Sequence, residues 1–169
     1  MTIKNLVLYV CIAMFCFIGC SKPSEEVVEI RKFSIDRIIL QSIAELDSAD
    51  SGDGLGSIKI KTAEPTVVRL FETGDIDIEN ARLIYQAKVK TEGIEGKVFL
   101  EMWVHISSKG EFFSRGLQNQ LTGTMNWTTV ETPFFLKKGE NPDNVKLNLV
   151  IEGKGTAWID DVRLLRAPL

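Results

Sequence analysis

The sequence predicts an all-β protein, an antiparallel sandwich or barrel, and three observations support this. Short segments rich in β-branched and aromatic residues alternate apolar and polar side chains, as residues 57–62 do. Stretches rich in Gly, Asn, Asp and Lys separate these segments, and such stretches are typical of turns. No long window of the sequence has an unambiguous helical period.

The predicted strands follow one another through most of the chain, at residues 57–62, 66–72, 83–91, 98–107, 128–136, 145–152 and 157–165. Turns are expected between them, at residues 92–96, 108–111, 137–143 and 153–155. Residues 30–46 are ambiguous, because their isoleucines fit a helical stripe while Ile38-Ile39-Leu40 is also strand-like. We favour extended structure there.

The N-terminus has the pattern of a bacterial export signal. Lys4 precedes an uninterrupted apolar run, Leu6 to Ile18, which is shorter than the roughly 20 residues that a spanning helix needs. The following Gly19-Cys20 completes FIGC, which resembles the lipobox of bacterial lipoproteins. The resemblance implies cleavage before Cys20 and acylation of that residue. The protein would then be lipid-anchored to the bacterial cell membrane or outer membrane, facing the periplasm or the exterior.

These features divide the chain into three parts. We expect a signal peptide at 1–19, a lipidated tether at 20–29 and one β-domain at 30–169. All three cysteines lie at or before residue 20, so the expected domain has no disulfide and no thiol-based site. The net charge of −3 and the absence of a run of Lys or Arg argue against nucleic-acid binding.

Several segments, taken in their order, resemble the galactose-binding-like jelly roll of many carbohydrate-binding modules. The most specific segment is Gly153 to Leu164 (GKGTAWIDDVRL), and the similarity extends over residues 45 to 168. The earlier matching segments are residues 54–60, 81–89, 123–127 and 133–136. The resemblance implies an antiparallel jelly-roll β-sandwich, and it specifies fold better than ligand.

A candidate binding face follows from alternation along the strands. In residues 99–106 the aliphatic side chains share one face, and Glu101, Trp103 and His105 share the other. The same argument turns Gln86, Lys88 and Asn148 outward on their own strands. If these strands share the concave sheet of the resembled modules, the six side chains line a sugar-binding groove. In that groove an indole would pack against the C–H face of a pyranose while polar groups hydrogen-bond its hydroxyls.

The opposing interpretation is that Trp103 packs under a covering loop and that the charges form an ordinary solvated face. Phe112 and Phe113 cannot both point inward, so one is expected at the rim of the groove. Arg115 would either bind a ligand carboxylate or pair with Glu111. Trp127 and Trp158 are expected to be mainly structural.

An acidic loop and an acidic pair suggest a metal site. Oxygen ligands from a flexible loop suit Ca²⁺, and the resembled modules often bind a structural calcium through an aspartate of the terminal strand. The alternative is that Asp160 or Asp161 pairs with Arg163 or caps a turn and that the acidic loop is merely solvated. The candidate ligands are Asp47, Asp50, Asp53, Asp160 and Asp161.

We do not expect an enzyme. His105 is the only histidine, and no metalloprotease or nucleophile-elbow motif is present. The leading hypothesis is a non-catalytic, membrane-anchored lipoprotein that binds an oligosaccharide or polysaccharide at the cell envelope. The alternative is a protein-interaction or assembly module that docks an envelope protein on the same face. A Trp103 isolated in a polar groove would favour sugar, whereas one continuous with Phe112 or Phe113 would favour a protein.

Overall fold

The structure, a computed structural model, describes residues 26–39, 43–107 and 109–169, and it confirms the predicted antiparallel β-sandwich. Its elements are β1 (Val28–Lys32), η1 (Ile35–Arg37), β2 (Ala44–Asp47), β3 (Ser57–Thr62), β4 (Thr66–Thr73), β5 (Ala81–Ile106), β6 (Gly110–Arg115), η2 (Leu117–Asn119), β7 (Leu121–Leu136) and β8 (Asn144–Ala167). Within the described residues, no helix is long and apolar enough to cross a membrane.

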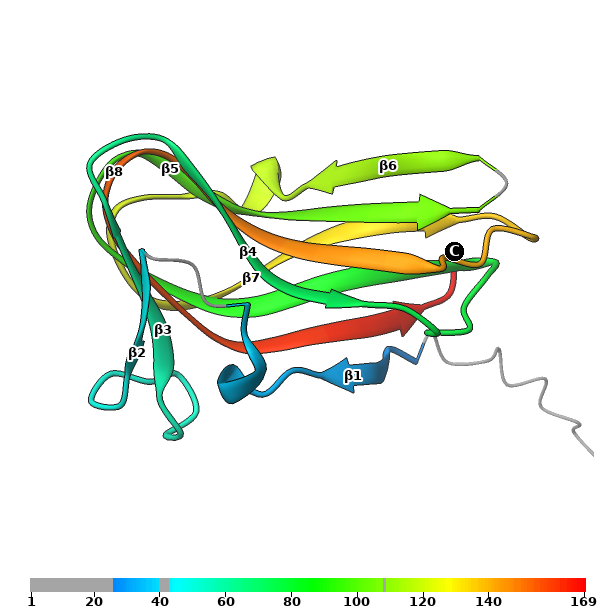
Figure 1. Ribbon diagram of the computed structural model, residues 1–169, viewed down its shortest axis with the longest axis horizontal. Helices are drawn as coiled ribbons and strands as arrows, with labels where there is room; N and C mark the ends of the chain where they lie inside the picture. The colour runs from blue at the N-terminus through cyan, green and yellow to red at the C-terminus, as the bar shows by residue number, and fades with distance from the viewer. Residues whose placement is uncertain (1–25, 40–42, 108) are drawn as a thin grey trace, which may run out of the picture.

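Two long strands, β5 and β8, hold the molecule together. They pair antiparallel along almost their whole length, from Arg82 opposite Ala167 to His105 opposite Asn144. Both strands bend at one end of the molecule, where Figure 1 shows them curling from one layer into the other. The turns predicted at residues 92–96 and 153–155 are therefore wrong: these residues are bends inside continuous strands.

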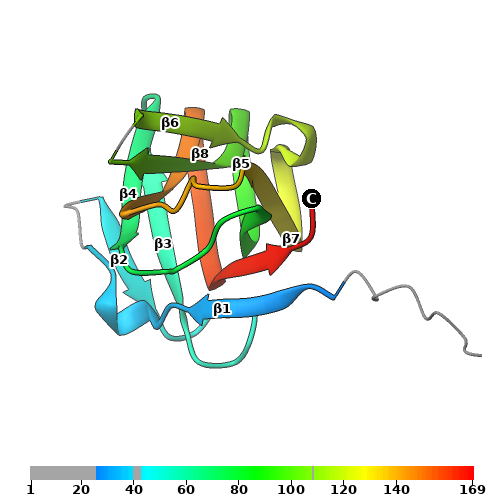
Figure 2. The same ribbon diagram turned by 90° about the vertical axis from the view of Figure 1, so that its right-hand side faces the viewer.

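The bends divide the sheet into two layers. The β4 layer contains β4, residues 144–151 of β8, residues 97–106 of β5, and β6. The β7 layer contains β7, residues 81–91 of β5, residues 156–167 of β8, and then β1 and β3, with β2 beyond β3. In Figure 2, β6 and β1 lie on opposite sides of the sandwich. The outer faces of the two layers point in opposite directions.

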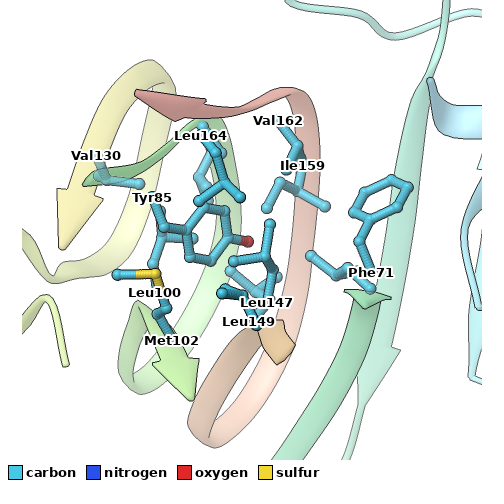
Figure 3. Packing of buried hydrophobic residues seen from close by; sticks show 14 of the residues in the cluster. Phe71, Tyr85, Leu100, Met102, Val130, Leu147, Leu149, Ile159, Val162 and Leu164 are labelled. Atoms are coloured by element: carbon cyan, nitrogen blue, oxygen red, sulfur yellow. The ribbon is translucent and has the colours of Figure 1, made fainter. Parts of the chain in front are cut away.

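The core fills the space between the layers with aliphatic side chains. Leu100, Met102, Leu147 and Leu149 of the β4 layer face residues of the β7 layer such as Tyr85 (Figure 3). The Tyr85 hydroxyl is buried there without a hydrogen-bond partner among the described residues, and burial raises the pKa of this hydroxyl far above its ordinary value. The inward positions in the β4 layer agree with the predicted alternation.

Residues 30–46, whose sequence fitted both a helix and a strand, contain parts of two strands and a short 3-10 helix. Strand β1 pairs with the end of β8, the 3-10 helix η1 follows it, and β2 pairs with β3. Residues 40–42 lie outside the described residues. Val28 and Glu29, assigned by the sequence to the tether, are the first residues of β1. The signal peptide and Cys20 also lie outside the described residues, so cleavage and acylation stay predictions.

Glycine is required where the bends of β5 and β8 cross. Gly96 and Gly153 are opposite each other with φ of +129° and +145°, in a region that side chains disfavour. A Cβ on Gly96 would overlap the backbone carbonyl oxygen of Glu152, and a Cβ on Gly153 would overlap that of Glu95. The two strands can change layer while staying paired only because neither residue has a side chain.

We predict that Gly96→Ala lowers the free energy of unfolding by at least about 3 kcal/mol, because backbone strain of about 1–3 kcal/mol is added to a clash with backbone. Gly93→Ala is the matched control, since Gly93 also has a positive φ but open space around it. Gly93→Ala should lower the free energy of unfolding by only about 1–2 kcal/mol. Urea unfolding of both variants measures the difference, and equal losses would contradict the crossing argument.

Candidate ligand-binding face

The outer face of the β4 layer carries a row of polar residues beside a row of aromatic ones. Strand register aligns Arg69, Asn148, Glu101 and Arg115 across β4, β8, β5 and β6. The neighbouring row is Lys146, Trp103 and Phe113, on β8, β5 and β6. Alternation of side chains along each strand places both rows outside the core. We call this surface the Trp103 face.

Glu101 organises the polar row. Its side chain is almost fully buried, and its carboxylate accepts hydrogen bonds from Trp103 Nε1 at 2.7 Å, Asn148 Nδ2 at 3.0 Å and Arg115 Nε at 2.7 Å. Burial alone would raise the pKa of the Glu101 carboxyl, but these three donors outweigh burial and lower the pKa below its usual value. Glu101 is therefore a buried anion that fixes the orientation of its neighbours.

Trp103 and Phe113 form an aromatic surface beside this row. Their ring centroids lie 5.2 Å apart with the planes inclined at 42°, and the Arg115 guanidinium lies 4.9 Å from the centre of the Phe113 ring. Phe112 and Phe113 are both exposed, so the rings do not both point inward, as the sequence predicted, and two rings rather than one lie at the rim. Arg115 pairs with Glu101, while Glu111 pairs with Lys146 at 2.5 Å, so the predicted alternative of an Arg115–Glu111 pair is also wrong.

Asn148 leaves one polar atom without a partner at the bottom of this face. Its side chain is 5% exposed, and its Nδ2 donates to Glu101. Its Oδ1 is buried and accepts no hydrogen bond from the residues that the structure describes. Asn148 lines a shallow depression of about 390 Å³ together with Val67, Arg69, Glu101, Trp103, Glu111, Arg115 and Lys146. A buried acceptor without a donor is uncommon, and at the floor of a depression it suits a ligand hydroxyl.

The structure brings together four of the predicted site residues and separates the others. Trp103, Glu101, Asn148 and Arg115 line the depression. His105 follows Trp103 on the same face, but it lies outside the depression and its Nδ1 contacts Asp143 Oδ1 at 2.5 Å. The Asp143 carboxyl also accepts a hydrogen bond from Ser107 Oγ; these contacts, with the Ser107 bond the stronger influence, lower the pKa of Asp143.

Gln86 and Lys88 belong to the outer face of the β7 layer, so the prediction that they share a groove with Trp103 is wrong. Gln86 Nε2 donates to Glu131 Oε2 at 3.0 Å, and Lys88 Nζ donates to the Gly52 carbonyl oxygen at 2.9 Å. Both residues precede the bend of β5, whereas Trp103 follows it. The bend carries the two parts of the strand to opposite sides of the molecule.

The sequence-based site omitted Arg69, Lys146 and Val67, which line the same depression. Lys146 has the same alternation as Asn148 two residues later, which was a usable signal. Arg69 gave no comparable signal, because its place depends on the pairing of β4 with β8 and on a register shift between Arg69 and Phe71.

The acidic loop is held by donors from distant strands. Asp47 accepts from Trp158 Nε1 at 3.0 Å and Asp50 from Trp127 Nε1 at 3.1 Å, so both tryptophans anchor this loop. The hydrogen bond from Trp158 is the main cause of the lowered pKa of Asp47. Asp50 also pairs with Lys90. The loop therefore packs on the outer face of the β7 layer.

Asp160 and Asp161, the acidic pair in β8, also have hydrogen-bonded or ion-paired carboxylates. Asp160 Oδ2 accepts from Ser51 Oγ and from the backbone amides of Gly52 and Asp53, at 2.8–3.0 Å. Asp161 has a φ of +51° and pairs with Arg163 at 2.6 Å and with Lys32 at 2.9 Å. Burial would raise the pKa of Asp161, but these two cations hold it below its usual value.

These residues do not fit a calcium site. Calcium needs six to eight oxygen ligands, whereas the carboxylates predicted as ligands face amide, indole, ammonium and guanidinium donors. Within residues 26–39, 43–107 and 109–169, no group of three or more His, Cys, Asp or Glu is arranged to hold a metal ion. The alternative from the sequence, that Asp160 or Asp161 pairs with Arg163 or caps a turn, describes the contacts better.

A second, larger depression of about 620 Å³ lies beside η1 and the acidic loop. Its lining includes apolar side chains such as Phe33 and Leu46 and the charged residues Lys32, Asp53 and Asp161. The Asp53 and Asp161 carboxylates already contact Lys32, at 3.4 and 2.9 Å. Its polar groups are thus paired, and the Trp103 face is the stronger candidate.

Comparison with known proteins identifies relatives only at the level of structure. No protein-family model matches the sequence, and no curated protein matches it. Solved structures do match. One is the Clostridium thermocellum endo-1,4-β-D-xylanase 10B, as its CBM22-1–GH10 modules complexed with xylohexaose, with a TM-score of 0.59 and 15% identity. That match covers 82% of this chain but only 28% of the xylanase chain.

Two isolated modules match over nearly their whole length. The family 30 carbohydrate-binding module of a cellulosomal cellulase from Clostridium thermocellum has a TM-score of 0.51 and 16% identity, covering 82% of this chain and 96% of that one. The CBM22-1 xylan-binding domain of a Paenibacillus barcinonensis protein has a TM-score of 0.51 and 9% identity, covering 85% and 94%. At these identities the similarity establishes a shared β-sandwich fold.

We predict that the melting temperature of the purified protein stays the same after EDTA treatment and after addition of excess Ca²⁺. The reason is that the carboxylates of the acidic loop are already hydrogen-bonded to the protein. Differential scanning calorimetry measures this directly. A specific ion at 100 times its Kd would add about 2.7 kcal/mol of stability, so a rise of several degrees with Ca²⁺ but not with Mg²⁺ would contradict the assignment.

Proposed function

We propose that this protein binds an oligosaccharide or polysaccharide on the Trp103 face without cleaving it. The observation that carries the proposal is the buried Asn148 Oδ1, which has no hydrogen-bond partner among the described residues and belongs to a depression that Trp103 also lines. A sugar supplies both complements, because its hydroxyls donate hydrogen bonds and its C–H face packs against an aromatic ring. The shared fold with carbohydrate-binding modules supports the same function.

The arrangement favours binding over catalysis. Glycoside hydrolysis uses two carboxyl groups on either side of the scissile bond, one of them able to give up a proton. Glu101 is the buried carboxylate of the depression, and its three hydrogen bonds stabilise the ionised form. Glu111, the other carboxylate of the lining, pairs with Lys146. Glu101 is therefore not a suitable general acid in this arrangement.

We predict that the full chain, purified in detergent, binds at least one member of a panel of plant and envelope polysaccharides. Trp103→Ala should weaken that binding at least ten-fold, which corresponds to about 1.4 kcal/mol. Met125→Ala is the control, because it removes an exposed apolar side chain of β7 that lines neither the Trp103 depression nor the depression shared by Phe113 and Arg115. Affinity electrophoresis measures binding, and a thermal melt shows that each variant is folded. Equal effects of both substitutions would contradict the assigned face.

One observation favours the second candidate function, docking of a protein partner. Trp103 is not isolated, since it contacts Phe113, and Phe112 and Phe113 are both exposed at the edge strand β6. Against this, charged residues surround the aromatic pair, and the depression contains a buried polar floor. Absence of binding to every glycan of the panel would favour the protein-docking function.

We further propose that the protein is a lipoprotein of the bacterial cell envelope, anchored through acylated Cys20. The FIGC motif and the preceding apolar run support this proposal. Two or more acyl chains give stable membrane binding where one gives only marginal binding.

We predict that cells expressing the full chain incorporate labelled palmitate into it and that Cys20→Ser abolishes the label. The Cys20→Ser protein should also no longer need detergent for its release from the membrane fraction. Cys16→Ser is the matched control, since Cys16 lies inside the expected signal peptide and should not affect labelling. Undiminished labelling of the Cys20 variant would exclude this residue as the anchor.

A further inference from the structure

Cationic side chains surround the depression of the Trp103 face and retain unused hydrogen-bond donors. Arg69, Arg115 and Lys146 line it, with side chains that are 45%, 44% and 23% exposed. The carboxylates of the lining are Glu101 and Glu111, so the depression has one more cation than anion, although the whole chain carries a net charge of −3. Glu72 lies outside the lining but 3.6 Å from Arg69, so the excess of one cation belongs to the lining alone.

The three cationic side chains differ in how many of their N–H groups are already hydrogen-bonded. An arginine has five N–H groups, and the Arg115–Glu101 hydrogen bond uses only the one on Nε. Arg69 has Glu72 as a charged neighbour, but the atoms are 3.6 Å apart, beyond ordinary hydrogen-bond distance. Lys146 donates to Glu111, and an ammonium group has two further protons. The depression consequently offers many more donors than acceptors.

The depression has fewer acceptors than donors. The Glu101 carboxylate already accepts hydrogen bonds from Trp103, Asn148 and Arg115, and it is almost fully buried. Asn148 Oδ1, on the strand position opposite Arg69, is the acceptor left for a ligand hydroxyl. A neutral glycan presents hydroxyls, which can serve as donors or acceptors, but it does not neutralise guanidinium groups. A carboxylate or sulfate ester accepts hydrogen bonds from a guanidinium group and also neutralises its charge, and it can pair bidentately with arginine.

We propose that the Trp103 face is selective for an anionic polysaccharide, one whose sugars carry carboxylate or sulfate groups beside free hydroxyls. The anionic group contacts Arg69 and the free protons of Lys146, an adjacent hydroxyl donates to Asn148 Oδ1, and the sugar ring packs on Trp103. This proposal rests on the proposed function, because it names the class of glycan that the same face binds.

The test compares ligands that differ only in charge. Binding to the full chain in detergent is measured for two pairs of polymers. The first pair is polygalacturonate and the same polymer with its carboxyl groups reduced to alcohols. The second pair is dextran sulfate and unmodified dextran. We expect at least ten-fold tighter binding of one anionic polymer than of its neutral partner. Preference for polygalacturonate identifies the carboxylate as the recognised group, and preference for dextran sulfate identifies the sulfate ester.

Two arginine variants distinguish a site from diffuse attraction. Arg69→Gln should reduce the preference for the anionic polymer by about ten-fold, and Arg166→Gln, which makes the same charge change at an exposed position of β8 outside the depression, should leave it unchanged. Equal losses in the two variants would overturn the proposal. Equal binding of charged and neutral polymers would overturn it while leaving glycan binding intact, whereas failure of every glycan in both panels would overturn the proposed function as well.

Discussion

The pairing of β5 with β8 through a shared bend is the constraint on which the rest of the structure depends. Each strand contributes to both layers, so the bend fixes how the layers face each other and which residues fill the space between them. Gly96 and Gly153 make the bend possible, because their backbones approach too closely for any side chain. The position of the Trp103 face follows from this bend, since the face begins only where β5 has crossed into the β4 layer.

Within that layer, Glu101 connects the fold to the candidate function. Burying an ionised carboxylate is costly unless charged and polar partners surround it, and Trp103, Asn148 and Arg115 provide those partners. The same three side chains line the depression. Their conformations are thus set before any ligand arrives, which reduces the entropy lost on binding. The carboxylate acts by positioning its neighbours, while Asn148 Oδ1 keeps an unused lone pair among the described residues and the Trp103 ring lines the depression.

Alternation along single strands predicted much of this face correctly, because the side on which a residue lies is a local property of an extended chain. Glu101, Trp103 and Asn148 were identified in this way. Gln86 could not be assigned to a layer from the sequence, since residues 92–96 have the composition of a turn but continue the strand. Arg69 was missed because its neighbours are set by the pairing of β4 with β8, which depends on contacts between distant segments. The loop carboxylates suggested metal ligands because the sequence does not show that Trp127 and Trp158 donate hydrogen bonds to them.

The two outer faces of the sandwich divide its roles. The acidic loop packs on the β7 layer, and Trp127, Trp158, Lys88 and Lys90 hold it there. Strand β1, where the described chain begins, also belongs to that layer through its pairing with the end of β8. If Cys20 carries the proposed lipid anchor, the chain that follows it enters the fold in the β7 layer. The Trp103 face belongs to the other layer, so the two proposals assign attachment and ligand binding to different layers of the sandwich.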